Sequence, residues 1–180
     1  WEIVVLDKLN YASSGLDRLR DINVFDEKRV LVLTSDFSKV IEEGIAKEIG
    51  DVEYIFHLAA ESHVDNSIKN PEPFVMSNVV GTMRLLDFAR KLNNLKKFNY
   101  FNTDEVFEPA PEGINYKEWD RHNPTNPYSA SKAGGEMLSL AYANTYGLPV
   151  FITNTMNVFG ERQHPEKFIP MTIKKVYFVI

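Results

Sequence analysis

The sequence contains no cysteine, which excludes disulfide bonds and thiolate metal sites. Its histidines form no His-x3-His or His-x2-Glu pair, so we expect no metal centre. They are His57, His63, His122 and His164. No apolar run is long enough to span a membrane, and the first residues lack a signal-peptide pattern. We therefore expect a soluble protein of the reducing cytoplasm, without a membrane partner.

A strongly basic surface is also missing. The formal net charge is -5, and the densest basic spots are the single pairs Lys96-Lys97 and Lys174-Lys175. Nucleic-acid binding would need a clustered basic face, so we expect no nucleic-acid partner. Hydrophobic residues make up 44% and charged residues 25% of the 180 positions, which is typical of one folded domain with a core.

Short apolar runs alternate with segments of helical periodicity. The runs predict strands at Trp1–Leu6, Val30–Leu33, Val52–Ala60, Lys97–Asn102 and Pro149–Val158. The periodicity predicts helices over residues 38–49, 74–93 and about 128–146, the last ending before Gly147. This alternation predicts a doubly wound α/β fold whose mostly parallel sheet is covered on both faces. Ligands of such sheets bind beyond the carboxyl ends of the strands.

Tyr128 and Lys132 are four residues apart, which places them on one face of the predicted helix. A lysine ammonium beside a phenol should lower the phenol pKa from about 10, so that Tyr128 could accept a proton from a sugar hydroxyl. The sequence has eight tyrosines, so a chance pair on a solvated face remains the alternative.

The acidic pair Asp104-Glu105 follows Thr103 at the end of the fourth predicted strand. Consecutive strand side chains point to opposite faces, so the chain must turn here if both carboxylates are to reach one site. Two carboxylates in different environments could divide the roles of acid and base. An ordinary acidic loop is the alternative.

Asp7 stands at the tip of the first predicted strand. In dinucleotide-binding folds an acidic residue at this place binds the adenosine ribose hydroxyls and disfavours a 2′-phosphate. Asp7 therefore favours NAD over NADP, with a simple turn or cap aspartate as the alternative.

Together these segments resemble the extended short-chain dehydrogenase/reductases, and within them the nucleotide-sugar 4,6-dehydratases of the dTDP-glucose type. The matching stretches are VVLDKLNYAS (4–13), HLAAESHVDNSI (57–68), NVVGTMRLLDFAR (78–90), NTDEVF (102–107), NPYSASKAGGE (126–136) and NVFGERQHPEKFIP (157–170). They occur in family order and cover nearly the whole chain. Tyr-x3-Lys marks only the superfamily, whereas Thr-Asp-Glu is more specific because epimerase and decarboxylase relatives lack the acidic pair.

The resemblance implies a Rossmann-like fold and a role for each matching residue. The implied catalytic residues are Thr103, Asp104, Glu105, Tyr128 and Lys132. The implied NAD-binding residues are Asp7, Lys8, Asp36, Phe37, Leu58, Ala59 and Ala60, with Tyr128 and Lys132. The implied substrate-binding residues are Ser62, Thr103, Asn157, Glu166 and Lys167.

The implied reaction oxidises the sugar at C4, removes water across C5 and C6, and reduces C6. Tyr128 would be the base at the 4-hydroxyl, to which Thr103 would hydrogen-bond, and hydride would pass to NAD. Glu105 would take the C5 proton while Asp104 protonates the departing 6-hydroxyl. Hydride would then return to C6 and give a 4-keto-6-deoxy sugar nucleotide. The residues themselves do not fix the nucleotide.

The sequence also lacks the Gly-rich turn that cradles the pyrophosphate in this family. Asp7 normally follows that turn by roughly 20 residues, so we expect a fragment that begins after it. We expect the absent strand to have stood between residues 3–6 and 98–102. We also expect residues 160–180 to begin the substrate-binding region of a larger protein. On this view the 180 residues alone would be inactive or nearly so.

Three residues around the acidic pair depart from the family pattern, namely Asn102 for Ser, Phe107 for Tyr and Glu108 for Gly. One alternative function is therefore an epimerase or decarboxylase of the same superfamily. Another is a non-catalytic, truncated domain that self-associates. The family forms a dimer through a four-helix bundle, so we expect a homodimer through the helices at 74–93 and 128–146.

Overall fold

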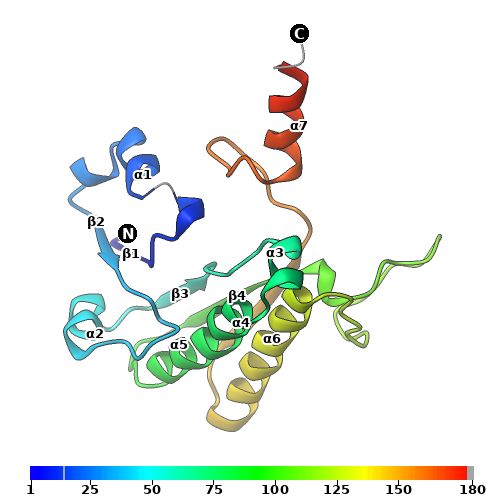
Figure 1. The fold of residues 1–180 in the computed structure, drawn as a ribbon. Helices are drawn as coiled ribbons and strands as arrows, with labels where there is room; N and C mark the ends of the chain where they lie inside the picture. The colour runs from blue at the N-terminus through cyan, green and yellow to red at the C-terminus, as the bar shows by residue number, and fades with distance from the viewer. Residues whose placement is uncertain (14, 178–180) are drawn as a thin grey trace. The chain divides into compact units, whose positions relative to one another are not determined.

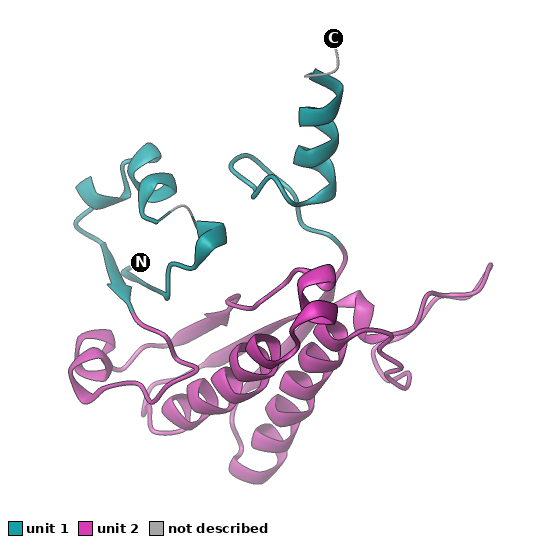
Figure 2. Ribbon diagram, viewed as in Figure 1, with its two compact units in different colours: residues 1–34, 157–180 teal, residues 35–156 magenta. Residues whose placement is uncertain are grey.

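The computed structural model describes residues 1–13 and 15–177. It divides into two compact units (Figure 2). Unit 1 comprises residues 1–34 and 157–180, and unit 2 comprises residues 35–156. Of the described helices, none is long and apolar enough to cross a membrane.

Unit 2 is built on a parallel three-stranded sheet in the order β3-β4-β5. The strands are β3 (Tyr54–His57), β4 (Lys97–Thr103) and β5 (Val150–Thr155). The predicted parallel pairing is confirmed. The expected place of the absent strand, next to residues 98–102, was wrong, because β4 is paired on both sides and the edge strands of this sheet are β3 and β5.

One face of this sheet carries a long helical segment and the helix α6 (Figure 1). The segment consists of α4 (Glu72–Phe74), a π-helical stretch (Val75–Gly81) and α5 (Thr82–Ala89). It ends four residues before the predicted limit at 93. The reason is that the backbone N–H groups of Asn93 and Asn94 donate to Asp51 Oδ1, at 2.9 and 3.2 Å.

Helix α6 (Pro127–Tyr146) has the ends that its sequence predicts. Asn126 and Ser129 exchange the two hydrogen bonds of a capping box, and Pro127 occupies the first turn, where no N–H partner is needed. Gly147 ends the helix in the left-handed conformation, at φ 67°.

The core of unit 2 lies between β4 and the helices. Phe98 and Tyr100 alternate along β4 and are fully buried against Leu86, Ala89 and Leu148. Gly135 lets α6 approach closely, because a Cβ at this position would lie 2.2 Å from the Tyr100 hydroxyl. On the other face of the sheet, Phe56 and Phe151 remain 65% and 49% exposed.

The other helices of unit 2 are short. They are α2 (Glu43–Ile49), which begins later than the predicted helix over 38–49, α3 (Val64–Lys69), and the 3-10 turn η4 (Asp104–Val106). The sequence did not predict α3, a helix of six residues whose N-cap is His63.

Unit 1 contains the parallel strands β1 (Ile3–Asp7) and β2 (Val30–Thr34). Between them lie η1 (Tyr11–Ser13), α1 (Asp17–Asp21) and η2 (Val24–Asp26). The unit also contains α7 (Phe168–Tyr177). Tyr177 is the last residue of α7, and residues 178–180 lie outside the described residues.

Candidate active site

The carboxyl end of β4 carries the Thr-Asp-Glu sequence. Thr103 is the last strand residue, and the 3-10 turn η4 starts at Asp104, so the chain turns where the sequence required a turn. The Thr103 hydroxyl accepts the Glu105 N–H at 3.3 Å and donates to Asp104 Oδ1 at 3.2 Å. The Asp104 carboxylate and the backbone of Glu105 are thereby fixed beside the strand end.

Tyr128 enters the same site from the first turn of α6. Its N–H donates to Ser67 Oγ at 3.1 Å, and its ring packs edge-on against Phe74, 6.4 Å away. The phenol is buried, hydrogen-bonds the side chain of Thr103, and lies within electrostatic range of Glu105 and Asp104. The structure thus brings together four of the five predicted catalytic side chains.

The predicted effect of the lysine on the phenol was wrong for this arrangement. Burial, and then the charge of Glu105, raise the pKa of Tyr128 to about 12, although the Thr103 hydrogen bond acts in the opposite direction. Lys132, the fifth residue, directs its ammonium to the Phe101 carbonyl at 2.7 Å and lies 4.5 Å from the Tyr100 ring centre. Burial lowers the pKa of Lys132 to about 8.

Two residues of the site were missed in the sequence. Asn126 donates from its amide to Glu105 Oε2 at 3.4 Å, in addition to capping α6. Glu136 is buried and within electrostatic range of Lys132. The signal for Glu136 was its spacing, since Tyr128, Lys132 and Glu136 follow one another at four-residue intervals on one helix face.

The predicted cofactor residues of unit 2 lie after β2 and β3. Asp36 Oδ1 accepts the Ser38 N–H at 3.0 Å, and Phe37 packs edge-on against His57 at 5.5 Å. After β3, Leu58 is 62% exposed and is followed by the half-buried Ala59 and Ala60.

Asn78 fixes the course of the chain just after these alanines. Its amide oxygen accepts the Glu61 N–H, and its amide nitrogen donates to the Glu61 carbonyl, both at 2.9 Å. Ser62, a predicted substrate residue, follows and is exposed.

The remaining predicted residues belong to unit 1. Asp7 ends β1, and its carboxylate accepts the Leu9 N–H at 2.6 Å, with Lys8 between them. Glu166 accepts a hydrogen bond from the Tyr11 hydroxyl at 3.2 Å. Lys167 and the exposed Asn157 complete the set.

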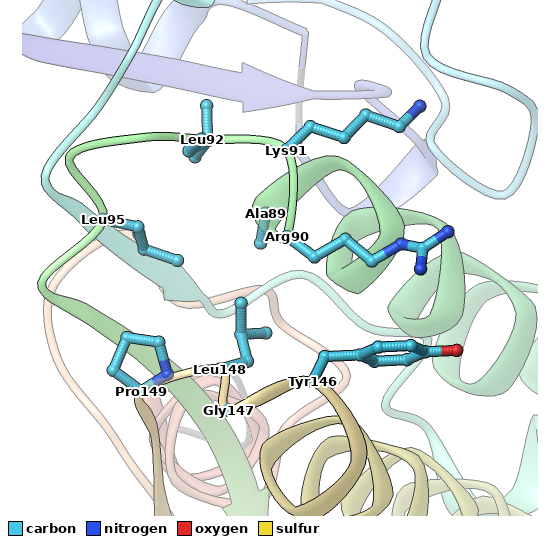
Figure 3. Close-up of a pocket in the computed structure, with 9 residues that line it drawn as sticks. All are labelled: Ala89, Arg90, Lys91, Leu92, Leu95, Tyr146, Gly147, Leu148 and Pro149. Atoms are coloured by element: carbon cyan, nitrogen blue, oxygen red, sulfur yellow. The ribbon is translucent and has the colours of Figure 1, made fainter.

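A pocket of about 450 Å³ lies in unit 2 away from these groups (Figure 3). It lies between the end of α5 and the end of α6, next to Leu95 and Pro149, which precede β4 and β5. Because Thr103 lies at the other end of β4, this pocket is not part of the candidate active site. No group of three or more His, Asp or Glu among residues 1–13 and 15–177 could hold a metal ion.

Residues 4–179 match the family described as GDP-mannose 4,6 dehydratase. The chain belongs to the GDP-mannose 4,6 dehydratase family. The resemblance drawn from the sequence motifs is therefore confirmed.

Members of this family with assigned activities are similar over almost all of the chain. The chain is 36% identical over 176 residues to the dTDP-glucose 4,6-dehydratase of Mycobacterium tuberculosis, covering 97% of this chain and 50% of that protein. It is 39% identical over 179 residues to RHM1 of Arabidopsis thaliana, a trifunctional UDP-glucose 4,6-dehydratase, UDP-4-keto-6-deoxy-D-glucose 3,5-epimerase and UDP-4-keto-L-rhamnose-reductase. That match covers 96% of this chain and 26% of RHM1.

A solved family structure has the same fold. The crystal structure of DesIV, a dTDP-glucose 4,6-dehydratase from Streptomyces venezuelae with NAD and TYD bound, superposes with a TM-score of 0.88 at 37% identity. The match covers 99% of this chain and 53% of DesIV, which confirms the predicted Rossmann-like fold. The chain thus spans about half the length of the bacterial relatives and about a quarter of the plant protein.

Proposed function

We propose that this protein acts as an NAD-dependent nucleotide-sugar 4,6-dehydratase. The observation that carries the proposal is the grouping of Thr103, Asp104, Glu105 and Tyr128 at the end of β4, with Lys132 one turn farther along α6. This set contains a phenol, a buried ammonium and an adjacent acidic pair, which together supply the groups needed for C4 oxidation and for loss of water.

NAD fits the residues around this site. Leu58 leaves an apolar side chain largely exposed at the end of β3, and the small Ala59 and Ala60 allow a ligand to approach the backbone there. The proposed cofactor residues of unit 2 are Lys132, Tyr128, Asp36 and Phe37, with Leu58, Ala59 and Ala60. Asp7 and Lys8 of unit 1 are proposed cofactor residues from the family resemblance alone. When bound, NAD would accept the C4 hydride and return it to C6.

The remaining steps belong to the chain's own side chains. Thr103 would bind the sugar 4-hydroxyl and Tyr128 would take its proton. With a pKa of about 12, Tyr128 is a protonated phenol at neutral pH, so it can take the 4-hydroxyl proton only after it has released its own proton to solvent, which should accompany binding of cofactor and substrate. Once C4 is a ketone, the C5 proton is acidic; Glu105 would remove it while Asp104 protonates the leaving 6-hydroxyl.

We propose dTDP-glucose as the substrate and dTDP-4-keto-6-deoxyglucose as the product. Support comes from the names of the Mycobacterium and Streptomyces relatives, while the similarity to RHM1 keeps UDP-glucose as the competing substrate. Ser62, Asn157, Glu166 and Lys167 are the proposed substrate-binding residues besides Thr103.

The test is formation of the 4-keto sugar from dTDP-glucose with added NAD, by a protein of the bacterial relatives' full length that contains these residues, because the 180 residues alone are expected to be inactive or nearly so. Asp104→Asn should slow water loss by about 100-fold while C4 oxidation, followed as transient NADH absorbance, persists. Glu112→Gln, in the exposed loop of unit 2, is the matched control and should be neutral. An Asp104→Asn protein that dehydrates at the normal rate would contradict the role assigned to Asp104, whereas a wild-type protein that forms no 4-keto-6-deoxy product would favour an epimerase or decarboxylase.

We also propose that the protein is a cytoplasmic homodimer that binds no nucleic acid. The long helical segment and α6 leave apolar side chains exposed, with Val75 at 46%, Met76 at 40%, Met137 at 49% and Leu140 at 40%. Exposed apolar side chains on adjacent helices are typical of a subunit interface. Met137→Glu with Leu140→Glu should convert the dimer to a monomer on size-exclusion chromatography with light scattering; an unchanged mass would contradict this interface.

A further inference from the structure

Glu136 is held between two side chains from different parts of unit 2. It lies on α6 one turn after Lys132 and is 5% exposed. Its Oε2 accepts a hydrogen bond from the amide of Asn102 on β4. Its Oε1 lies 3.4 Å from Nε2 of His122, which comes from the loop before α6. A buried carboxylate with partners on both oxygens has a fixed position.

Of the titratable side chains described around Lys132, which are His57, Tyr100 and Glu136, Glu136 is the one that carries a negative charge. His57 of β3 faces Lys132, but burial, and then the charge of Lys132, lower the pKa of His57 to about 3, so this imidazole is neutral. Tyr100 of β4 lies under the ammonium, and burial followed by the Glu136 charge raises the pKa of its phenol. The carboxylate of Glu136 favours the charged form of Lys132, whereas burial opposes it.

The three departures from the family pattern converge on this carboxylate or on the loop that presents His122. Asn102 donates to Glu136 directly. The Phe107 ring packs with His122 in an edge-to-face contact at 5.2 Å. Glu108 accepts the amide of Asn123, the residue after His122, at 2.8 Å. The substitutions therefore form one local arrangement rather than three unrelated changes.

We propose that Glu136 is a positioning residue for the dehydratase reaction, and that Asn102 and His122 hold it where its charge keeps Lys132 protonated. Lys132 remains the group that contacts the cofactor, and Glu136 acts only through it. The catalytic consequence rests on the proposed function, whereas the electrostatic effect on Lys132 does not.

The first experiment measures the proton on Lys132 without cofactor or substrate. In protein labelled with ¹³C at lysine Cε, the Lys132 signal is assigned by its loss in Lys132→Arg and is titrated by NMR. Glu136→Gln keeps the size and the hydrogen-bonding capacity of the side chain but removes its charge. The pKa of Lys132 should be about one pH unit lower in this variant than in the wild-type protein, because the carboxylate that favours the ammonium is gone.

Asp87→Asn is the matched control, because it also removes one negative charge from the helices of unit 2. Asp87 accepts the Tyr142 hydroxyl at 3.0 Å and pairs with Arg90 at 3.1 Å. This variant should leave the Lys132 titration unchanged. If Glu136→Gln also leaves it unchanged, or if Asp87→Asn shifts it equally, the proposal is wrong.

A second variant covers the case in which Glu136→Gln does not fold. His122→Gln leaves the charge of Glu136 in place but loosens its position, so the fall in the Lys132 pKa should be smaller but measurable. A folded His122→Gln protein with an unchanged Lys132 titration would then overturn the assigned role of His122.

The second experiment follows dehydratase activity against pH. In Glu136→Gln the decline of kcat/KM on the alkaline side should begin about one pH unit lower, because Lys132 loses its proton earlier. Glu136→Asp should restore most of the alkaline limb, and Ser139→Ala, a buried neighbour on α6, should not move it. A uniform loss of activity without a change in the profile would indicate a structural role only. If no variant and no wild-type protein dehydrates dTDP-glucose, the proposed function fails, while the NMR titration still decides the role of Glu136.

Discussion

The two units contain similar parallel strands but differ in what covers them. In unit 2, Phe98 and Tyr100 on β4 are fully buried beneath α5 and α6. In unit 1, of the described hydrophobic side chains, Leu33 on β2 is the buried one, at 8% exposure, while Ile3 on β1 is 52% exposed. The candidate catalytic residues Thr103, Asp104, Glu105 and Tyr128 lie in unit 2, whose packing fixes side chains as a preorganised site requires.

The largest effect that we expect comes from removing a core side chain of unit 2. Phe98→Ala should reduce the free energy of unfolding by about 3–5 kcal/mol, because it leaves a cavity between β4 and the helices. Leu33→Ala in unit 1 should cost less and should leave unit 2 folded. Urea unfolding, with hydrogen exchange of the β4 amides, measures both.

One result would contradict the proposed difference in stability between the two units. If Leu33→Ala lowers protection of the β4 amides as much as Phe98→Ala does, then the units unfold as one cooperative structure. The difference in burial would then have no consequence for local stability.

A buried histidine should give unit 2 a distinctive pH dependence. His57 donates to or accepts from Thr82 Oγ1 at 2.9 Å, and burial, followed by Lys132, lowers its pKa from 6.5 to about 3. Below pH 6.5 His57 becomes protonated in the unfolded chain but stays neutral in the native chain. The free energy of unfolding therefore decreases as pH falls. The slope approaches about 1.4 kcal/mol per pH unit well below pH 6.5, and the loss between pH 6.5 and 4.5 is roughly 2 kcal/mol.

His57→Gln should therefore show a flatter stability curve over this range. The measurement is urea unfolding at pH 7.5 and 4.5, and the informative quantity is the difference between the two proteins rather than either curve. Equal pH dependence in both would mean that His57 is protonated in the native state.

The close contact of α6 at Gly135 predicts a smaller loss of unfolding free energy than the Phe98→Ala substitution does. A Cβ there would lie 2.2 Å from the Tyr100 hydroxyl and 2.7 Å from the Asn78 carbonyl, so Gly135→Ala must push α6 away from β4. We expect a loss of about 1–3 kcal/mol. Gly134→Ala is the control, because its Cβ would meet only Val79, with a closest approach of 3.2 Å. The melting temperature of Gly135→Ala should lie well below that of Gly134→Ala. Equal melting temperatures would show that α6 is not in tight contact at Gly135.

The sequence predicted correctly those features that are set by the residues at the feature itself, such as a helix end or a turn. The end of helix α6 was predicted from Gly147, which stops the helix through its own backbone conformation. The Thr103 turn also follows from adjacent residues. The pairing of strands is a long-range property, which explains why the absent strand was expected next to residues 98–102, although β4 is paired with both β3 and β5.

The pKa of Tyr128 shows why site chemistry was harder to predict than site membership. Spacing places Tyr128 and Lys132 on one face, but it does not give the depth of burial or the direction of the ammonium. In the structure Lys132 reaches the Phe101 carbonyl, and Glu105 lies close enough to Tyr128 to raise its pKa. Glu136 escaped notice because its partners Asn102 and His122 are distant in sequence.

The smallest predicted effects test whether the effect of a substitution on stability depends on the burial of the residue or on the unit to which it belongs. Helix α2 belongs to unit 2 but has no buried residue, so it should respond like an isolated helix. Gly44 lies inside the helix, and a Cβ added there would have no atom within 4 Å. Gly44→Ala should therefore increase the free energy of unfolding by about 0.5–1 kcal/mol. Gly50 caps the same helix at φ 69° and ψ −161°, a conformation essentially restricted to glycine, so Gly50→Ala should destabilise it instead. Opposite signs in thermal unfolding would show that local backbone conformation governs α2, whereas a loss at both positions would mean that α2 is packed more tightly than its exposure indicates.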